Sequence, residues 1–225
     1  MKKRLIIFFL VSAFVFSALE LYVVNYYSQD ISLTGFFSSI LSSVAGTGQN
    51  KLIRINLYNY SIALYQDGAL IKQAKIAGAG NPKISPTPVG NFKVLAKEKR
   101  HVVWSTRIVM PYSLRFYNGY YIHDIPLTLS GQLISTQYSA GCVRLDSNLA
   151  PEVFDWAEIG TRVEIYKAQL VKTAEAPMVY LLTKDGLCQP IASPEVFQAQ
   201  GFHWQDVAVI PAAEILGYPQ GSLIE

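Results

Sequence analysis

The sequence predicts a mainly β fold for the central part of this chain, and three features support that prediction. Between residues 51 and 167, short runs rich in Ile, Val and Tyr are separated by turn residues. The first run alternates polar and apolar side chains with the two-residue period of a half-buried strand, and an Asp-Gly pair marks a hairpin turn after the second run. The flanks differ: residues 1–50 hold an apolar segment and a Ser-rich stretch, and residues 168–225 combine hairpin and helix signals.

The N-terminus predicts a transmembrane helix that also directs export. Three cations at positions 2–4 precede a largely apolar segment, residues 5–24, which is long enough to cross a bilayer. The cations keep the N-terminus in the cytoplasm, so the rest of the chain lies outside it. A cut after Ala18 would place Phe16 where a cleavage site requires a small side chain, so we favour an uncleaved signal anchor over residues 1–27. Cleavage and secretion to the cell wall is the alternative.

The segment after the anchor and the net charge limit the possible partners. Residues 28–50 are rich in Ser and Gly and are interpreted as a flexible linker, with a short interfacial helix as the alternative because apolar pairs interrupt them. The formal net charge of +3 is accounted for by the three cations at positions 2–4, which leaves the exported part neutral. A neutral exported part without a basic patch argues against nucleic acid as a partner.

The strands of the central region are expected in chain order. In the first of them, Ile53 and Ile55 face the core, and Arg54 and Asn56 lie on the opposite face. A rigid loop rich in Gly and Pro is expected between residues 78 and 90. The expected strands cover residues 51–58, 61–66, 69–78, 91–97, 104–110, 117–124 and 161–167.

The remaining elements are a short helix and a C-terminal module. The helix is expected before the last of these strands, because Asp146, Ser147 or Asn148 can cap its N-terminus and Pro151 suits its first turn. Residues 168–225 are predicted to form a small separate α+β module, with a hairpin, a capped helical stretch and a final apolar segment.

The candidate chemistry centres on Cys142, one of only two cysteines in the chain. It follows Gly141 and precedes Arg144 by two residues in the stretch Gln-Tyr-Ser-Ala-Gly-Cys-Val-Arg-Leu-Asp. His123, nineteen residues earlier, is the candidate base that promotes a thiolate. The backbone amides of Gly141 and Cys142 can both point at a developing oxyanion. The residues alone leave three roles open for Cys142: a nucleophile, half of a disulfide, or a small buried side chain.

Four stretches of the sequence agree in order and spacing with one known family. They are Ser-Ala-Gly-Cys-Val-Arg-Leu, the upstream Tyr-Ile-His, Met-Pro-Tyr-Ser-Leu-Arg-Phe-Tyr-Asn-Gly before it, and the earlier Thr-Pro-Val-Gly-Asn-Phe-Lys-Val. Over about residues 51–167 the chain therefore resembles the catalytic domain of the L,D-transpeptidases, the YkuD-like family. The resemblance implies a β-sandwich enzyme of the bacterial cell wall, located outside the cytoplasmic membrane, that uses neither a metal nor an organic cofactor.

The resemblance also implies a reaction on peptidoglycan stem peptides. The cysteine attacks the third residue of a tetrapeptide stem, releases the terminal D-alanine and forms a thioester. An amine of a second stem then attacks the thioester and gives a 3→3 cross-link. Water in place of the amine gives an L,D-carboxypeptidase, and a member that has lost catalysis would bind peptidoglycan only.

The family motif implies a role for five residues of this chain. Cys142 is the nucleophile, and His123 is the base that activates it and later relays a proton. Gly141 and Cys142 supply oxyanion donors. Ser139 shapes the turn and bonds to the histidine or the substrate. Arg144 holds the loop or a substrate carboxylate.

Two tyrosines and two departures from the family pattern bear on substrate binding. Tyr112 and Tyr121 are expected to line the acyl-donor groove, with a place among the core aromatics as the alternative. Ala140 stands where many members have His, and Asp124 stands where Gly or Ser usually follows the catalytic His. Asp124 can still offer the backbone carbonyl that orients the imidazole. Its carboxylate is expected either to raise the pKa of the imidazole, which favours an imidazolium–thiolate pair, or to repel an acidic substrate.

The other cysteine and histidines receive structural interpretations. Cys188 is expected to be a small strand residue, and a Cys142–Cys188 disulfide is the alternative. His101 is expected in a surface loop. His203 is expected in an aromatic packing corner, because no second ligand stands at zinc spacing.

Two roles are considered for the C-terminal module. Tyr180, Phe202 and Trp204 motivate docking to wall glycan or to a partner protein. A structural cap on the catalytic domain is the alternative.

Overall fold

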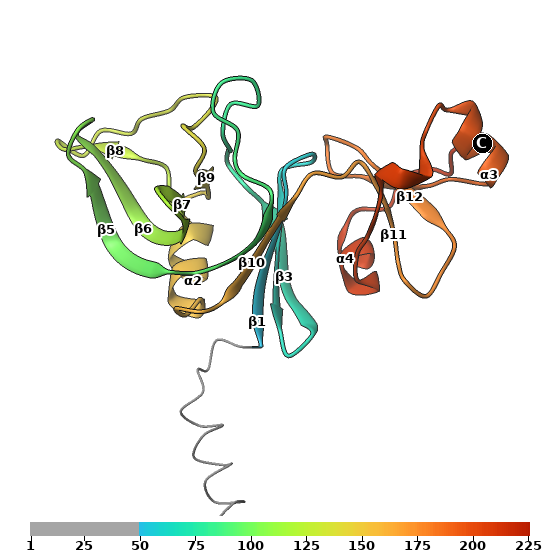
Figure 1. The fold of residues 1–225 in the computed structure, drawn as a ribbon, viewed down its shortest axis with the longest axis horizontal. Helices are drawn as coiled ribbons and strands as arrows, with labels where there is room; N and C mark the ends of the chain where they lie inside the picture. The colour runs from blue at the N-terminus through green and yellow to red at the C-terminus, as the bar shows by residue number, and fades with distance from the viewer. Residues whose placement is uncertain (1–49) are drawn as a thin grey trace, which may run out of the picture. The chain divides into compact units, whose positions relative to one another are not determined.

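The computed structural model describes residues 50–225, which belong to one compact unit. The signal anchor and nearly all of the linker expected from the sequence lie outside these residues. Within the described part of the chain, no helix combines the length and hydropathy that a membrane span needs. The described residues form three sheets and a few short helices, so the fold is mainly β, as predicted (Figure 1).

The first sheet contains the first strands of the chain and the strand that closes the central region. Its order is β3-β2-β1-β10-β4. The predicted Asp67-Gly68 turn is present, and both residues have the positive φ angles, 52° and 82°, that a tight hairpin requires. The strands are β1 (Lys51–Asn56), β2 (Ser61–Gln66), β3 (Ala69–Lys75), β4 (Gly90–Lys93) and β10 (Arg162–Tyr166), and β10 runs parallel to β1.

The second sheet carries the segments that the motifs single out. Its order is β5-β6-β7-β9, and the short strand β8 pairs with β6. The strand expected at 104–110 begins only at Ile108, because Arg107 has a φ of 54° and ends a turn. The strands are β5 (Ala96–Val103), β6 (Ile108–Tyr117), β7 (Tyr120–His123), β8 (Leu127–Thr128) and β9 (Val143–Arg144).

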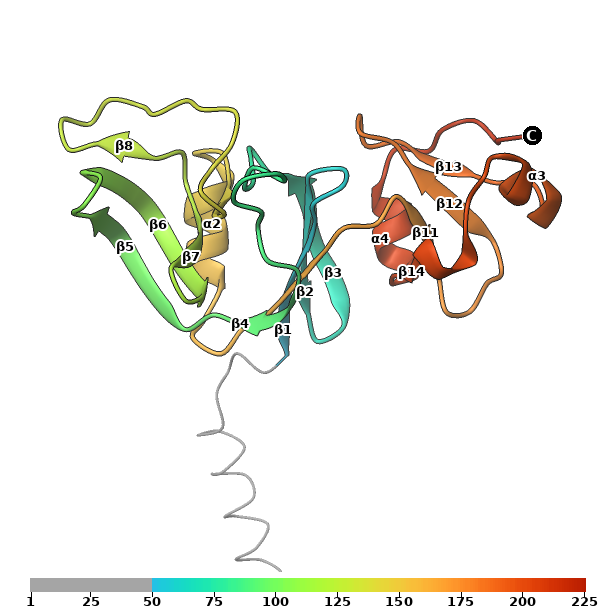
Figure 2. The same ribbon diagram turned by 45° about the horizontal axis from the view of Figure 1, so that its top comes forward.

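The expected helix, α2 (Leu149–Trp156), packs between the two sheets in both views (Figures 1 and 2). Of the three candidate caps, Asp146 serves, since its Oδ1 accepts hydrogen bonds from the backbone N–H groups of Asn148 (2.9 Å) and Leu149 (2.8 Å). Val153 is fully buried in a core to which β1, β2, β6, β7, β9 and β10 also contribute. This core fixes the two sheets against each other.

The prediction that β1 buries only one face is wrong. Arg54 and Asn56, on the polar face, are 4% and 1% exposed. Arg54 forms an ion pair of 2.5 Å with Glu214 of α4 (Ala212–Gly217), and Asn56 exchanges two hydrogen bonds with the backbone of Ala168. The strand alternates polar and apolar residues because its polar face is covered by a complementary polar surface.

The C-terminal part has its own sheet, with the order β13-β12-β11-β14, and two small apolar cores. The capped helical stretch that the sequence predicts is α3, and its cap is Ser193, which accepts a hydrogen bond from the N–H of Val196 at 3.3 Å. The α+β character expected for this region is therefore present. Its elements are β11 (Leu170–Lys172), β12 (Val179–Leu182), β13 (Cys188–Pro190), α3 (Pro194–Ala199), the 3-10 turn η1 (Trp204–Asp206), β14 (Val207–Val209) and α4.

Glu214 joins the C-terminal part to the first sheet and is 1% exposed. It accepts hydrogen bonds from Tyr65 (3.0 Å) and Tyr166 (2.6 Å) as well as pairing with Arg54. We expect Glu214→Ala to lower the free energy of unfolding by roughly 3 kcal/mol, because it leaves a buried guanidinium without its closest partner. Urea unfolding measures the change. The exposed Glu175→Ala is the control, and equal midpoints for the two variants would contradict the role assigned to Glu214.

Candidate active site

The parallel pairing of β7 with β9 brings the two candidate catalytic residues onto one face. Ile122 is opposite Val143 and His123 is opposite Arg144. Ile122 and Val143 are fully buried in the core. Because successive side chains of a strand point to opposite faces, His123 and Cys142 both lie on the side away from the core. The Cys142 thiol is half-buried, with its Sγ 4.0 Å from the carbonyl oxygen of Gly119.

Ser139 closes the turn that presents Cys142. Its Oγ donates a hydrogen bond to the carbonyl oxygen of Cys142 at 2.6 Å and accepts one from the N–H of Gly141 at 3.0 Å. The expectation that Gly141 supplies an oxyanion donor is therefore not met in this arrangement, because that N–H is already occupied. Within residues 50–225 no hydrogen bond engages the N–H of Cys142, so this donor is available beside the thiol.

A segment from the predicted Gly- and Pro-rich loop supports this turn from the other side. The N–H of Arg144 donates to the carbonyl oxygen of Gly78 at 2.8 Å, and the N–H of Ser139 donates to that of Ala79 at 2.9 Å. A Cβ on Gly80 would lie 2.3 Å from a backbone carbonyl oxygen. This close approach requires glycine. The glycines of the loop therefore indicated that it packs against the turn before Cys142, a contact that the sequence analysis did not predict.

The imidazole of His123 is held in its neutral form. Its side chain is 2% exposed, and its Nδ1 is hydrogen-bonded to the backbone carbonyl oxygen of Asp124. A carbonyl can only accept, so Nδ1 carries the proton and Nε2 keeps its lone pair. Burial lowers the pKa of His123 to about 4, and the nearby charge of Arg144 acts in the same direction, outweighing the hydrogen bond to Asp124. The imidazole is therefore ready to accept a proton at neutral pH.

The Asp124 carboxylate does not act on the imidazole as expected. Its Oδ1 accepts hydrogen bonds from the hydroxyl of Ser147 at 2.9 Å and from the N–H of Ile125 at 2.6 Å. The side chain is 8% exposed and is occupied within the protein. The expected rise of the imidazole pKa is wrong, because only the backbone carbonyl of Asp124 contacts His123, as the family pattern implied.

The thiol of Cys142 is also neutral in the resting state. Burial raises its pKa, and this effect outweighs the hydrogen bond from the Tyr121 backbone and the positive charge of Arg144, which lower it. With a thiol on one residue and a neutral imidazole on the other, the site holds an uncharged pair. The expected imidazolium–thiolate pair is therefore not its resting state.

Arg144 holds the loop before the cysteine. Its Nη1 donates to the carbonyl oxygen of Thr136 at 2.8 Å and to the hydroxyl of the same residue at 2.9 Å. The side chain is 8% exposed, and burial lowers its pKa. This placement matches the first of the two roles considered for Arg144.

The two tyrosines have different surroundings. Tyr112 packs edge-on against Phe154 of α2 and belongs to the apolar core, with 5.7 Å between ring centroids. Tyr121 lies beside Cys142 and stacks on His101 with centroids 4.6 Å apart. His101 also pairs with Glu98 at 2.8 Å.

The interpretation of His101 as a surface loop residue is wrong. It belongs to β5, and pairing of this strand with β6 places the imidazole against Tyr121. The residue was missed because the loop expected around it from its charged neighbours is a strand in the structure.

The two cysteines are unpaired, so the structure does not contain the Cys142–Cys188 disulfide. Cys188 is fully buried in a core of the C-terminal part, as expected for a small strand residue. Among residues 50–225, no group of three or more His, Cys, Asp or Glu side chains is placed to bind a metal ion.

The chain belongs to the family of YkuD-type L,D-transpeptidase catalytic domains, whose model matches residues 50–165. A curated relative, L,D-transpeptidase 1 of Mycobacterium tuberculosis, is 29% identical over 102 residues, which are 40% of this chain and 40% of the relative. The chain thus matches about two-fifths of the length of that relative.

Two solved structures are similar to about half of the chain. An L,D-transpeptidase from Stackebrandtia nassauensis has a TM-score of 0.44 at 22% identity and covers 52% of this chain and 55% of its own. An L,D-transpeptidase from Mycobacterium smegmatis has a TM-score of 0.43 at 23% identity and covers 52% and 58%.

The pKa of His123 can be measured by following its imidazole signal by NMR, assigned with the variant His123→Gln. We expect a midpoint near pH 4. The unfolded chain has a pKa of about 6.5 and binds more protons between these values, so His123 should reduce stability as the pH falls from about 6.5 towards 4. A midpoint at or above about 6.5 would show that the imidazole is not held neutral by burial.

Gly141 has a φ of 114°, and a Cβ there would lie 2.1 Å from Cε1 of Tyr120. We expect Gly141→Ala to destabilise the protein by roughly 2–4 kcal/mol, because strain and overpacking add. Gly131→Ala is the matched control, since its φ of 87° is also positive but no atom lies within 4 Å of the new Cβ. Chemical unfolding compares the two, and equal losses of stability would mean that Tyr120 does not restrict position 141.

Proposed function

We propose that this protein is a peptidoglycan L,D-transpeptidase that works through a thioester on Cys142. The observation that carries the proposal is the position of a half-buried thiol directly before β9, the strand that pairs with β7 and so with the neutral, buried imidazole whose Nδ1 is fixed by the Asp124 carbonyl. Membership of the family supports the reaction type. The proposed partners are peptidoglycan stem peptides, and the proposed location is the outer side of the bacterial cytoplasmic membrane.

The first half of the reaction acylates the enzyme. Nε2 of His123 takes the thiol proton as Sγ of Cys142 bonds to the carbonyl carbon of the third stem residue. The N–H of Cys142 stabilises the oxyanion that forms. As the carbon–nitrogen bond breaks, the imidazolium returns the proton to the amine of the leaving D-alanine, and the thioester remains.

The second half uses the same groups in reverse. The side-chain amine of a second stem loses a proton to Nε2 and attacks the thioester carbonyl. The carbon–sulfur bond breaks, the thiolate recovers the proton, and an amide joins the two stems as a 3→3 cross-link. Both half-reactions begin and end with a neutral imidazole, so the base is restored after each of them.

The site also bears on the alternative hypothesis that the domain binds peptidoglycan without catalysing a reaction. The two residues that depart from the family pattern leave the nucleophile and base in place: Asp124 supplies its backbone carbonyl, and Ala140 accepts a hydrogen bond from Ser85 at 2.8 Å through its backbone oxygen. The Asp124 carboxylate bonds to Ser147 and Ile125, and Ala140 is exposed. These contacts favour the enzyme over the binding domain.

The proposal is tested with purified disaccharide tetrapeptide carrying either diaminopimelate or lysine as its third residue. Mass spectrometry should find a thioester adduct on the protein and 3→3 dimers among the products. Cys142→Ala should abolish both, and His123→Ala should lower the acylation rate by at least about 100-fold. Cys188→Ala is the control and should keep full activity, because Cys188 lies in another core.

Two other results would change the conclusion. Tripeptide without dimers would assign an L,D-carboxypeptidase. Protein with a free Cys142 thiol that forms neither adduct nor product with either stem would contradict catalysis and favour a peptidoglycan-binding role.

A further inference from the structure

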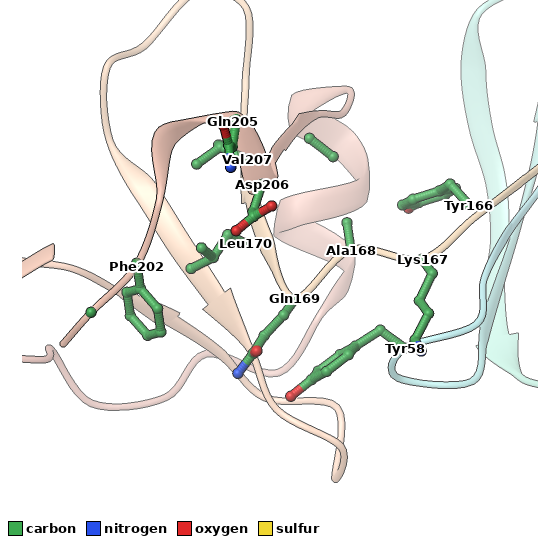
Figure 3. A pocket seen from close by; sticks show the side chains of 12 residues that line it. Tyr58, Tyr166, Lys167, Ala168, Gln169, Leu170, Phe202, Gln205, Asp206 and Val207 are labelled. Atoms are coloured by element: carbon green, nitrogen blue, oxygen red, sulfur yellow. The ribbon is translucent and has the colours of Figure 1, made fainter. Parts of the chain in front are cut away.

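A cleft of about 500 Å³ lies where the C-terminal part meets the first sheet (Figure 3). Its walls come from three segments: Tyr58 after β1, residues 166–170 from the end of β10 to the start of β11, and residues 201–202 and 205–208 around η1. The volume falls within the range of roughly 300–1,000 Å³ typical of ligand sites. None of these residues belongs to the candidate active site, so the cleft has no role in the proposed chemistry.

The base of the cleft is rigid. Ala168 and Leu170 are buried, at 7% and 3% exposure. Asn56 binds the backbone N–H and carbonyl of Ala168 and also accepts a hydrogen bond from the N–H of Tyr58 at 3.0 Å. One buried amide thus fixes two walls of the cleft relative to each other, so a ligand would meet a preformed site.

Two aromatic rings and several planar polar groups line the cleft. Tyr58 and Phe202 are half-buried, and in the view of Figure 3 the amide of Gln169 lies between their rings. Gln205 and Asp206 add an amide and a carboxylate from η1. Within the described part of the chain, the polar ends of these three side chains have no hydrogen-bond partner, so they are available to a ligand.

The charge of the cleft restricts the class of ligand. Lys167 and Asp206 contribute one charge of each sign, and the other lining side chains are neutral. A cleft whose lining charges sum to zero does not attract an acidic polymer. Aromatic faces carry partial negative charge and attract the C–H face of a sugar ring, while amides and carboxylates match hydroxyl and acetamido groups.

We infer that this cleft binds the glycan strand of peptidoglycan through its N-acetylated sugars. The choice of peptidoglycan as the ligand rests on the proposed function, because the glycan strand carries the stem peptides that the active site would join. Holding the strand raises the local concentration of stems at the enzyme. Of the aromatic residues singled out in the sequence, Phe202 lines the cleft. Trp204 instead stacks on Phe197 at 4.1 Å and lines a separate apolar groove.

The test uses the full-length Cys142→Ala chain in a detergent without a sugar headgroup. Calorimetry should detect binding of a soluble N-acetylglucosamine hexamer, which has no stem peptide. Tyr58→Ala and Gln169→Ala should each weaken this binding by about tenfold or more, and Trp204→Ala should not. Circular dichroism confirms that each variant is folded, and Gln169→Ala removes a side chain that the fold does not use.

The outcomes separate this inference from the proposed function. No binding of the hexamer, binding lost with Trp204→Ala only, or competition by free tetrapeptide would each overturn the glycan cleft. In the catalytically intact chain, Tyr58→Ala should leave turnover of soluble disaccharide tetrapeptide unchanged and reduce cross-linking in intact sacculi severalfold. Loss of turnover on the soluble substrate would show that Tyr58 serves the active site and would contradict a separate glycan site.

Discussion

The pairing of β7 with the two-residue strand β9 is the constraint on which the candidate site depends. It sets the register that puts Cys142 and His123 on the same face, while Ile122 and Val143 fill the core beneath them. A strand of two residues makes too few contacts to fix its pairing register alone. It is held from the other side by the segment through Gly78, whose backbone bonds to Arg144 in both directions. The turn that holds Cys142 therefore lies between β7 on one side and the segment through Gly78 on the other.

Burial decides the electrostatics of this site. Burial lowers the pKa of His123 and raises that of Cys142, so both groups are uncharged in the resting site. Arg144 adds positive charge nearby, yet its guanidinium is engaged with Thr136. In the proposed reaction, charge therefore develops only as the thiol attacks, and the N–H of Cys142, which has no hydrogen-bond partner among residues 50–225, would stabilise it.

Local features of the fold and site followed from the sequence, whereas distant contacts did not. Alternation, the Asp-Gly turn and the Ser193 cap are properties of neighbouring residues, and they predicted strands, hairpin and helix. Cys142 and His123 were recognisable from motifs. Nothing within β1 shows that Arg54 meets Glu214, 160 residues away. Likewise, only the fold shows that Ser147 occupies the Asp124 carboxylate.

A crystal structure of the protein acylated by a tetrapeptide stem would show directly whether Cys142 and His123 act together. We expect a thioester on Cys142 whose carbonyl oxygen accepts a hydrogen bond of about 3 Å from the Cys142 N–H. Nε2 of His123 should face the sulfur, and the N–H of Gly141 should remain bonded to Ser139. A thioester oxygen bound elsewhere, or another residue standing between the imidazole and the sulfur, would contradict the proposed roles of Cys142 and His123.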